Sequence, residues 1–334
     1  MFLDPTVIVL GAGGSAEFGF PTGIGIFREV MADEFSSRPL RKMIGYEFDF
    51  LSSFSNLLRV ANRHEELESF QALQLRLRQS HAQSIDLYAF KNPSQSEIAK
   101  LYTAWRLTKQ HFRIETFENR YREQDFRLVA VQDWLAPSVG QGPERRTNWI
   151  GALAQTFTAG ARTSADLAKN KLSVVTFNYD TVFEDAFPAI VRFDERFPDA
   201  PDEVMPKVLH VHGSLQPVVD GRFTFPFYLQ QMARIKFISD TSENPPMIVD
   251  EAVSVLDKAL RIYCVGFAFE EFNRELLQIG RWGGRAWALN FDGDVQVQNE
   301  IQKSGISPTR VWSGSDSKKW FLGTAASKGF FTSR

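Results

Sequence analysis

The feature that most constrains the fold is the stretch VIVLGAGGSAEFGFPTG at residues 7–23, where a short apolar run gives way to glycines. This order is typical of a β-strand that leads into a phosphate-binding turn. Gly11, Gly13 and Ala16 fit the spacing G-x-G-x-x-G/A, which provides a tight turn, a close backbone approach to a pyrophosphate and a small residue for helix packing. The following helix is expected to direct its free N–H groups at the phosphates. The chain should therefore begin with a nucleotide-binding βα unit.

The next stretch argues against an ordinary dehydrogenase. Such an enzyme needs a second strand that ends, about 20 residues on, in an acidic residue for the ribose. Here that region reads GIGIFREVMADEF, which has the pattern of an amphipathic helix. Glu29 and Asp33 therefore fall within a predicted helix and not at a strand end. Hydride transfer is disfavoured.

Short apolar or β-branched runs recur along the chain, most of them followed by a turn and a helical pattern. This alternation predicts an α/β fold, a Rossmann-like doubly wound parallel sheet. Residues 45–165 instead carry apolar residues at helical spacing, which predicts an inserted all-helical module beside a Rossmann domain of residues 1–44 and 166–334. The segment 136–148 has the composition of a linker. The predicted strands are 7–10, 172–176, 208–211, 261–265, 286–290 and 309–312.

Composition excludes several classes of protein. The formal net charge of −2 over 334 residues gives no overall field for nucleic acid or an anionic membrane. Cys264 is the one cysteine, so neither a disulfide framework nor a cysteine zinc site can form. No apolar run reaches the roughly 18 residues of a membrane helix. We expect a cytoplasmic protein that binds neither membrane nor nucleic acid directly.

Polar side chains follow two of the predicted strands. Asn178 and Asp180 come directly after one strand, and His212 and Gly213 follow another. Each has an ordinary structural explanation, because Asx residues cap helices and turn histidines form hydrogen bonds. Convergence at one edge of a parallel sheet, where α/β proteins bind ligands, favours a functional interpretation. His210 alternates with His212 along the predicted strand, so we expect it to face the other side and to be structural.

These motifs, in this order, resemble those of the sirtuin family. GAGGSAEFGFPTG is similar to the sirtuin loop GAG-x-S-x-x-x-G-I-P, and TFNYD to T-Q-N-I-D with Phe177 and Tyr179 changed. HVHGS resembles the sirtuin histidine motif, and VGFAFEEF keeps only Gly266 of G-T-S-L-x-V. Asn290 resembles the asparagine of the adenosine-side turn, and SGSDSKKWF falls where the last strand of the family meets adenine.

The sequence departs from the sirtuin motifs at two places, and these departures restrict the resemblance to one group within the family. Residues 215–260 contain no cysteine, so the tetrahedral zinc module of deacylating sirtuins is absent. Thr22 and Gly23 follow Pro21 where the family has D-F-R. The chain therefore looks like the zinc-less bacterial sirtuin-like NAD hydrolases of anti-phage defence. The resemblance implies cleavage of NAD⁺ to nicotinamide and ADP-ribose, with NAD⁺ as the substrate and no metal.

The chemistry of the side chains suggests roles for Asn178 and His212, and the resemblance implies the role of Asp180. Asn178 would hold the ribose hydroxyls or the reacting water, His212 would act as the base, and Asp180 would grip the nicotinamide carboxamide. Asp316 is an adenosine-side candidate with an alternative role as the N-cap of the last predicted helix. The residues expected to bind the nucleotide are Gly11, Ala12, Gly13, Ser15, Pro21, Thr176, Gly213, Gly266, Phe267, Asn290 and Asp316.

Two other functions fit the same motifs: an NAD-dependent deacylase without zinc, and a catalytically silent sensor of NAD⁺ or ADP-ribose that controls assembly. The sequence leaves open whether NADP⁺ is also cleaved and whether the product is cyclised. An unregulated NAD⁺ hydrolase would kill its host, and only GFFTSR follows the last predicted helix. We therefore expect a trigger in trans, through homo-oligomerisation and a partner sensor protein. The resemblance points to a ring-shaped HerA-type ATPase.

Overall fold

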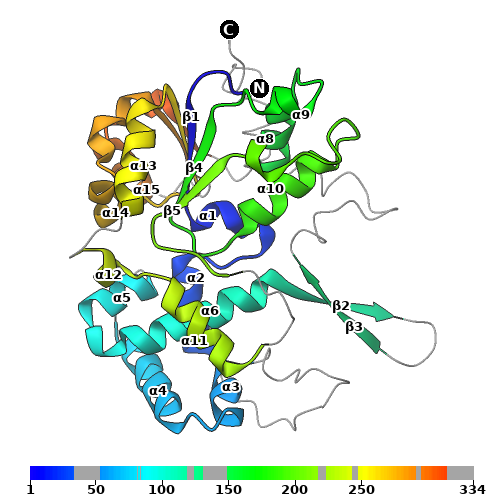
Figure 1. The fold of residues 1–334 in the computed structure, drawn as a ribbon. Helices are drawn as coiled ribbons and strands as arrows, with labels where there is room; N and C mark the ends of the chain where they lie inside the picture. Colours follow the sequence, from blue (N-terminus) through cyan, green and yellow to red (C-terminus); the bar gives the residue numbers. More distant parts are fainter. Residues whose placement is uncertain are drawn as a thin grey trace. The chain divides into compact units, whose positions relative to one another are not determined.

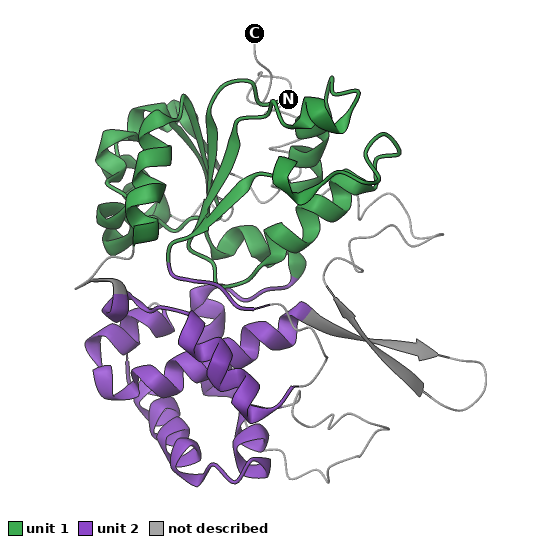
Figure 2. Ribbon diagram, viewed as in Figure 1, with its two compact units in different colours: residues 1–18, 112–211, 246–334 green, residues 19–111, 212–245 purple. Residues whose placement is uncertain are grey.

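The protein divides into two compact units, which are described separately (Figure 2). Unit 1 comprises residues 1–18, 112–211 and 246–334, and unit 2 comprises residues 19–111 and 212–245. These bounds differ from the predicted 1–44 with 166–334 and 45–165. The second unit begins at residue 19 and includes 212–245, and residues 112–165 belong to unit 1. The computed structural model describes residues 1–33, 53–80, 82, 84–118, 124–130, 149–216, 223–242, 247–290 and 295–313.

Unit 1 contains a sheet of six parallel strands in the order β5-β4-β1-β6-β7-β8 (Figure 1). Every predicted strand is confirmed, with ends that differ by a residue or two for β1, β5 and β8. Before β8, residues Pro308–Arg310 form a 3₁₀ turn, which suits a proline that cannot donate to a sheet ladder. The strands are β1 (Thr6–Leu10), β4 (Leu172–Thr176), β5 (Lys207–His210), β6 (Arg261–Val265), β7 (Ala286–Asn290) and β8 (Val311–Ser313).

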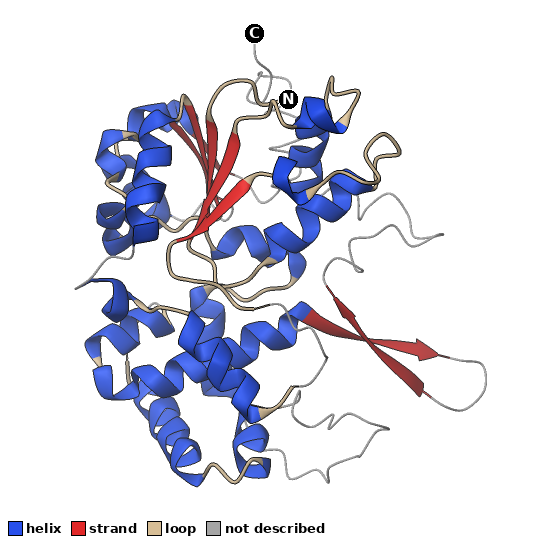
Figure 3. Cartoon of the chain, viewed as in Figure 1, coloured by secondary structure: helices blue, strands red, loops and turns tan. Residues whose placement is uncertain are grey.

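Helices cover both faces of this sheet (Figure 3). Val9, Val175 and Leu209 of the strands pack in one buried cluster with Leu256 of α13 and Ile301 of α15. In Figure 1, α8, α9 and α10 lie on the opposite side of the sheet from α13, α14 and α15. The helices are α1 (Ala12–Ser15), α8 (Trp149–Thr158), α9 (Ser164–Leu167), α10 (Val182–Arg192), α13 (Met247–Lys258), α14 (Glu271–Leu276) and α15 (Val295–Lys303).

The strand order identifies where a ligand can bind. Numbered along the chain, the strands of the sheet follow the Rossmann order 3-2-1-4-5-6. The order therefore reverses between β1 and β6, which pair in parallel along their whole length. Open α/β sheets bind ligands beyond the carboxyl ends of the strands at such a switch point. In this sheet the switch point lies at the ends of β1 and β6.

Unit 2 is helical and has its own aromatic core. The ring of Phe54 lies 4.8 Å from that of Phe70 and 5.3 Å from that of Tyr102, and all three are buried. Arg106 of α6 forms a two-pronged ion pair with Glu29 of α2. The helices are α2 (Gly23–Ala32), α3 (Phe54–Val60), α4 (His64–Arg78), α5 (Ile85–Lys91), α6 (Ser96–His111), α11 (Phe225–Arg234) and α12 (Ile238–Ser242).

One segment predicted to be helical is not. The stretch after α6 forms a hairpin of β2 (Phe112–Glu118) and β3 (Gln124–Ala130), which pair antiparallel. Its sequence FRIETFE alternates apolar and charged residues with the period of a strand at its start, so the helical prediction for this stretch was wrong. The predicted linker at 136–148 lies outside the described residues. Within the described ranges, no helix is long and apolar enough to cross a membrane.

Candidate functional site

The turn after β4 is held to the end of β1 by hydrogen bonds. Thr176 closes β4, and its hydroxyl donates to the carbonyl of Leu10 at 3.4 Å. The same hydroxyl accepts from the backbone N–H of Asn178 at 3.0 Å. Because Leu10 is the last residue of β1, the motif TFNYD is fixed next to the glycine loop. The structure thus brings together two stretches that the sequence places more than 160 residues apart.

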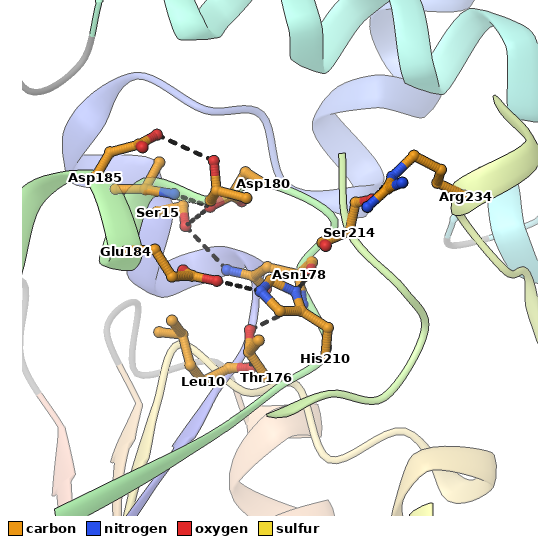
Figure 4. A network of polar contacts seen from close by, with 12 residues as sticks. Leu10, Ser15, Thr176, Asn178, Asp180, Glu184, Asp185, His210, Ser214 and Arg234 are labelled. Atoms are coloured by element: carbon orange, nitrogen blue, oxygen red, sulfur yellow. Dashed lines mark hydrogen bonds and ion pairs between the residues drawn. The ribbon is translucent and has the colours of Figure 1, made fainter. Parts of the chain in front are cut away.

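The side chain of Asn178 is held in one orientation at this edge (Figure 4). Its Nδ2 donates to the carbonyl of Gly11 at 3.2 Å and to the hydroxyl of Ser15 at 2.9 Å. A carbonyl oxygen only accepts, so the amide nitrogen and not the amide oxygen must face Gly11. Oδ1 then points away from both partners. It is buried and has no hydrogen-bond partner among the described residues, in a side chain that is only 5% exposed.

Ser15 links this amide to a carboxylate. Its hydroxyl accepts from Asn178 and donates to Oδ1 of Asp180 at 3.0 Å. The same carboxylate oxygen accepts from the backbone N–H of Val182, the first residue of α10, at 3.2 Å. Asp180 therefore accepts from the first N–H of α10 and anchors Ser15, which is the structural alternative to its predicted role at a carboxamide. The chain from Asn178 through Ser15 to Asp180 is a connected polar network.

Removing the middle of this chain should cost stability. Ser15→Ala leaves one hydrogen of the Asn178 amide and one site on Asp180 without a partner in a buried setting. We expect a loss of about 1–3 kcal/mol in the free energy of unfolding. Denaturant titration measures it, with Ser304→Ala as the control, because the buried Ser304 hydroxyl donates to the carbonyl of Glu300 inside α15 and leaves no second side chain unpaired. Equal losses for both variants would contradict a connected network.

The glycine loop packs directly against the end of β6. The N–H of Gly11 donates to Val265 O, and that of Gly13 donates to Gly266 O, both at 3.0 Å. A Cβ at Gly11 would lie 2.4 Å from Gly266 O, so the first glycine is required for this close approach. The backbone N–H of Gly13, a residue predicted to bind the nucleotide, is therefore paired with a carbonyl of the protein itself. Helix α1, which follows the first glycine, spans four residues, Ala12–Ser15.

The turn after β6 is aromatic and constrained. Gly266 has φ +60° and Phe269 has φ +59°, both in the left-handed region. The ring of Phe267 lies 5.0 Å from that of Phe177 and is buried in the sheet core, which differs from its expected contact with the nucleotide. Burial raises the pKa of the Glu270 carboxyl next to this turn. The Phe177 that departs from the sirtuin motif is thus a packing partner of Phe267.

His210, predicted to face away from His212 and to be structural, contacts residues of this network. Its Nδ1 is 2.9 Å from the carbonyl oxygen of Asn178, and its Nε2 contacts the carboxylate of Glu184 on α10. The alternation that separated His210 from His212 does not apply, because β5 ends at His210. Burial lowers the pKa of His210, but the hydrogen bond and charge of Glu184, helped by the Asn178 carbonyl and the charge of Asp180, raise it above its usual value overall.

His212, the residue predicted to act as the base, belongs to unit 2. His212 is buried, and its carbonyl accepts from the N–H of Lys236 at 2.8 Å. Gly213 has φ +76°, and a Cβ there would lie 2.1 Å from the carbonyl of Arg234, so this position requires glycine. Pro21 also belongs to unit 2. Among the described residues, no group of three or more His, Cys, Asp or Glu side chains could hold a metal ion.

The remaining predicted residues lie at element ends or outside the described ranges. Ala12 opens α1 directly after Gly11. Asn290 closes β7 and pairs in register with Ser313 of β8, at the carboxyl edge of the sheet. Asp316 lies outside the described residues. The cluster brought together by unit 1 is therefore Gly11, Ser15, Thr176, Asn178, Asp180, Glu184 and His210.

Comparison with known proteins identifies no family for this sequence. No protein-family model matches the sequence, and no curated protein matches it.

Proposed function

We propose that this protein hydrolyses NAD⁺ at the bond between ribose and nicotinamide, releasing nicotinamide and ADP-ribose. The observation that carries the proposal is the buried Oδ1 of Asn178, which has no hydrogen-bond partner among the described residues and is oriented by Gly11 and Ser15. A buried acceptor that is left unpaired costs about 1–3 kcal/mol, so it marks a position where a ligand donor fits. Its place at the carboxyl ends of parallel strands supports a nucleotide as that ligand.

The chemistry needs an acceptor, a water molecule and a base. Cleavage breaks the bond between ribose C1′ and the pyridinium nitrogen, and the electron pair stays with nicotinamide, which leaves as a neutral molecule. Water adds to C1′ and loses a proton to a base. Asn178 Oδ1 would accept from a ribose hydroxyl or from this water. His212 is the proposed base, an assignment that comes from the sequence resemblance.

The test is an assay of purified protein with NAD⁺ alone, followed by chromatography of nicotinamide and ADP-ribose. We expect nicotinamide release without any peptide. Release that occurs only with an acyl peptide would favour a deacylase, and binding without release would favour a silent sensor. Either result would contradict the proposal. The sequence resemblance also supports gating in trans, so the assay includes the self-associated protein and its complex with a HerA-type ATPase, separated by size.

Changing the proposed base gives a sharper result. His212→Ala should lower kcat by about 10²–10⁴-fold, the usual contribution of a general base. His64→Ala is the matched control, because His64 belongs to the same unit and is exposed on α4. Circular dichroism checks that both variants fold. Turnover by folded His212→Ala at the rate of the control would show that His212 is not the base.

A further inference from the structure

His210 has an acceptor at each ring nitrogen (Figure 4). It ends β5, in register with Thr176 at the end of β4. Nδ1 lies 2.9 Å from the backbone carbonyl oxygen of Asn178, and Nε2 contacts the carboxylate of Glu184. A carbonyl oxygen and an ionised carboxylate both accept only. Each ring nitrogen therefore needs a proton, and a ring with two N–H groups is an imidazolium.

The surroundings of the ring favour this charge. The carboxylate of Glu184 contacts the ring directly, and the charge of Asp180 acts on it from the turn before α10. The ring is largely buried, with 12% of the side chain exposed, whereas Glu184 is 33% exposed. Burial opposes the charge and these two carboxylates support it, so the pKa of His210 ends above its usual value.

We propose that His210, as an imidazolium, is a positioning residue that ties the main chain of Asn178 to Glu184 of α10 and so keeps Asn178 Oδ1 oriented for its ligand. The inference rests on the proposed function, because the amide that His210 positions is the one assigned to the ribose. The Asn178 side chain is already held by Gly11 and Ser15, and the main chain by Thr176. His210 adds the contact to the Asn178 carbonyl, which none of these supplies.

The contact between protonated His210 and the Glu184 carboxylate predicts a loss of activity at high pH. Below the pKa of His210 both hydrogen bonds form. As the pH rises through this pKa, one proton leaves, and the other stays on Nε2 because a hydrogen bond to an ionised acceptor is about twice as strong as a neutral one. The lone pair of Nδ1 then faces the Asn178 carbonyl, and the tie is lost. Glu184→Gln removes the charge that raises the pKa, so the alkaline limb should move to lower pH.

Two substitutions of His210 distinguish the contact made by Nδ1 from the contact made by Nε2. In His210→Asn the side-chain amide can take the place of Nδ1 and still donate to the Asn178 carbonyl. In His210→Gln the longer amide reaches toward Glu184 and leaves that carbonyl without its donor. We expect His210→Gln to lower kcat by about 10- to 100-fold with KM within about threefold of wild type, since small displacements of catalytic groups cost about this much. His210→Asn should keep kcat within about threefold and lose the alkaline limb.

The control for charge alone is Glu203→Gln, an exposed carboxylate of the same unit, which should leave the pH profile unchanged. Equal activity of His210→Gln and His210→Asn would overturn the proposal, as would an alkaline limb that does not move in Glu184→Gln. Nitrogen NMR of histidine-labelled protein, with His210→Asn for assignment, gives a readout without turnover. We expect two protonated ring nitrogens at pH 6. Carbon-13 NMR of protein that also carries a carbonyl label on asparagine should show a resonance of Asn178 that shifts as His210 titrates.

This NMR readout distinguishes the two proposals. If wild type releases no nicotinamide but His210 is an imidazolium that titrates together with the Asn178 carbonyl, the proposed function fails and the coupling of His210 to Asn178 stands. If wild type is active but His210 is neutral at pH 6, or titrates without any change at Asn178, the inference about His210 fails and the proposed function stands.

Discussion

Asn178→Ala should abolish useful NAD⁺ hydrolysis while the protein still folds. The substitution removes the buried Oδ1 that is assigned to the ribose or water, and with it the two hydrogen bonds to Gly11 and Ser15. Removal of one oriented polar group from an active site typically lowers kcat by about 10²–10³-fold. The cost in stability is smaller, about 1–2 kcal/mol, because it is limited to partners that lose a donor. Nicotinamide release and denaturant titration measure the two effects.

A second asparagine provides the matched control. Asn170 precedes β4, at the amino end of the same strand, and both atoms of its amide have partners, whereas Asn178 Oδ1 has none among the described residues. Oδ1 of Asn170 accepts from the N–H of Phe2 at 2.6 Å, and its Nδ2 donates to the carbonyl of Leu167 at 2.9 Å. Asn170→Ala should therefore lose stability by a similar amount and keep its kcat. If both variants lose activity in parallel with stability, Asn178 has a structural role only.

Gly266→Ala should destabilise unit 1 by about 2–5 kcal/mol. The residue has φ +60°, where alanine costs about 1–2 kcal/mol, and its Cβ would lie 1.9 Å from the backbone nitrogen of Gly14. Backbone atoms cannot rotate away as a side chain can, so overpacking adds about 1–3 kcal/mol. Denaturant titration followed by circular dichroism measures the loss.

Substitutions at two other glycines separate the cost of the positive φ from the cost of the Cβ clash. Gly160 has φ +79° with no atom near its Cβ position, so Gly160→Ala should show the conformational cost alone. Gly280 has neither a positive φ nor a neighbour within 4 Å, so Gly280→Ala should be close to neutral. If Gly266→Ala lowers the free energy of unfolding no more than Gly160→Ala does, the loop after β1 can move away from the end of β6. That result would contradict the close packing described above.

Much of the sheet could be predicted because its signals are local. Each parallel strand is a short apolar run that ends in a turn, and burial on both faces makes such runs stand out. The meeting of Asn178 with Gly11 could also be predicted, since the carboxyl ends of parallel strands share one edge. The amide orientation could not, because it depends on the Gly11 carbonyl and the Ser15 hydroxyl, whose positions follow from the folded loop.

Other features depend on contacts that local patterns do not show. The contact of His210 with the Asn178 carbonyl was missed because the alternation argument assumed a strand that continues to His212, whereas β5 ends at His210. The inclusion of residues 212–245 in unit 2 reflects contacts with residues distant in sequence, such as the ion pair of Lys100 with Asp240. The backbone N–H of Ile238 likewise donates to Asp86 at 3.0 Å. No period in the sequence predicts such pairs.

The central claim is that Asn178 Oδ1 receives a donor from a nucleotide at the carboxyl ends of β1 and β4. A crystal structure of the protein with ADP-ribose tests this most directly. We expect a ribose hydroxyl within about 2.6–3.2 Å of Asn178 Oδ1, with the amide still donating to Gly11 and Ser15. A nucleotide bound elsewhere in the protein, with this oxygen left unpaired, would contradict it.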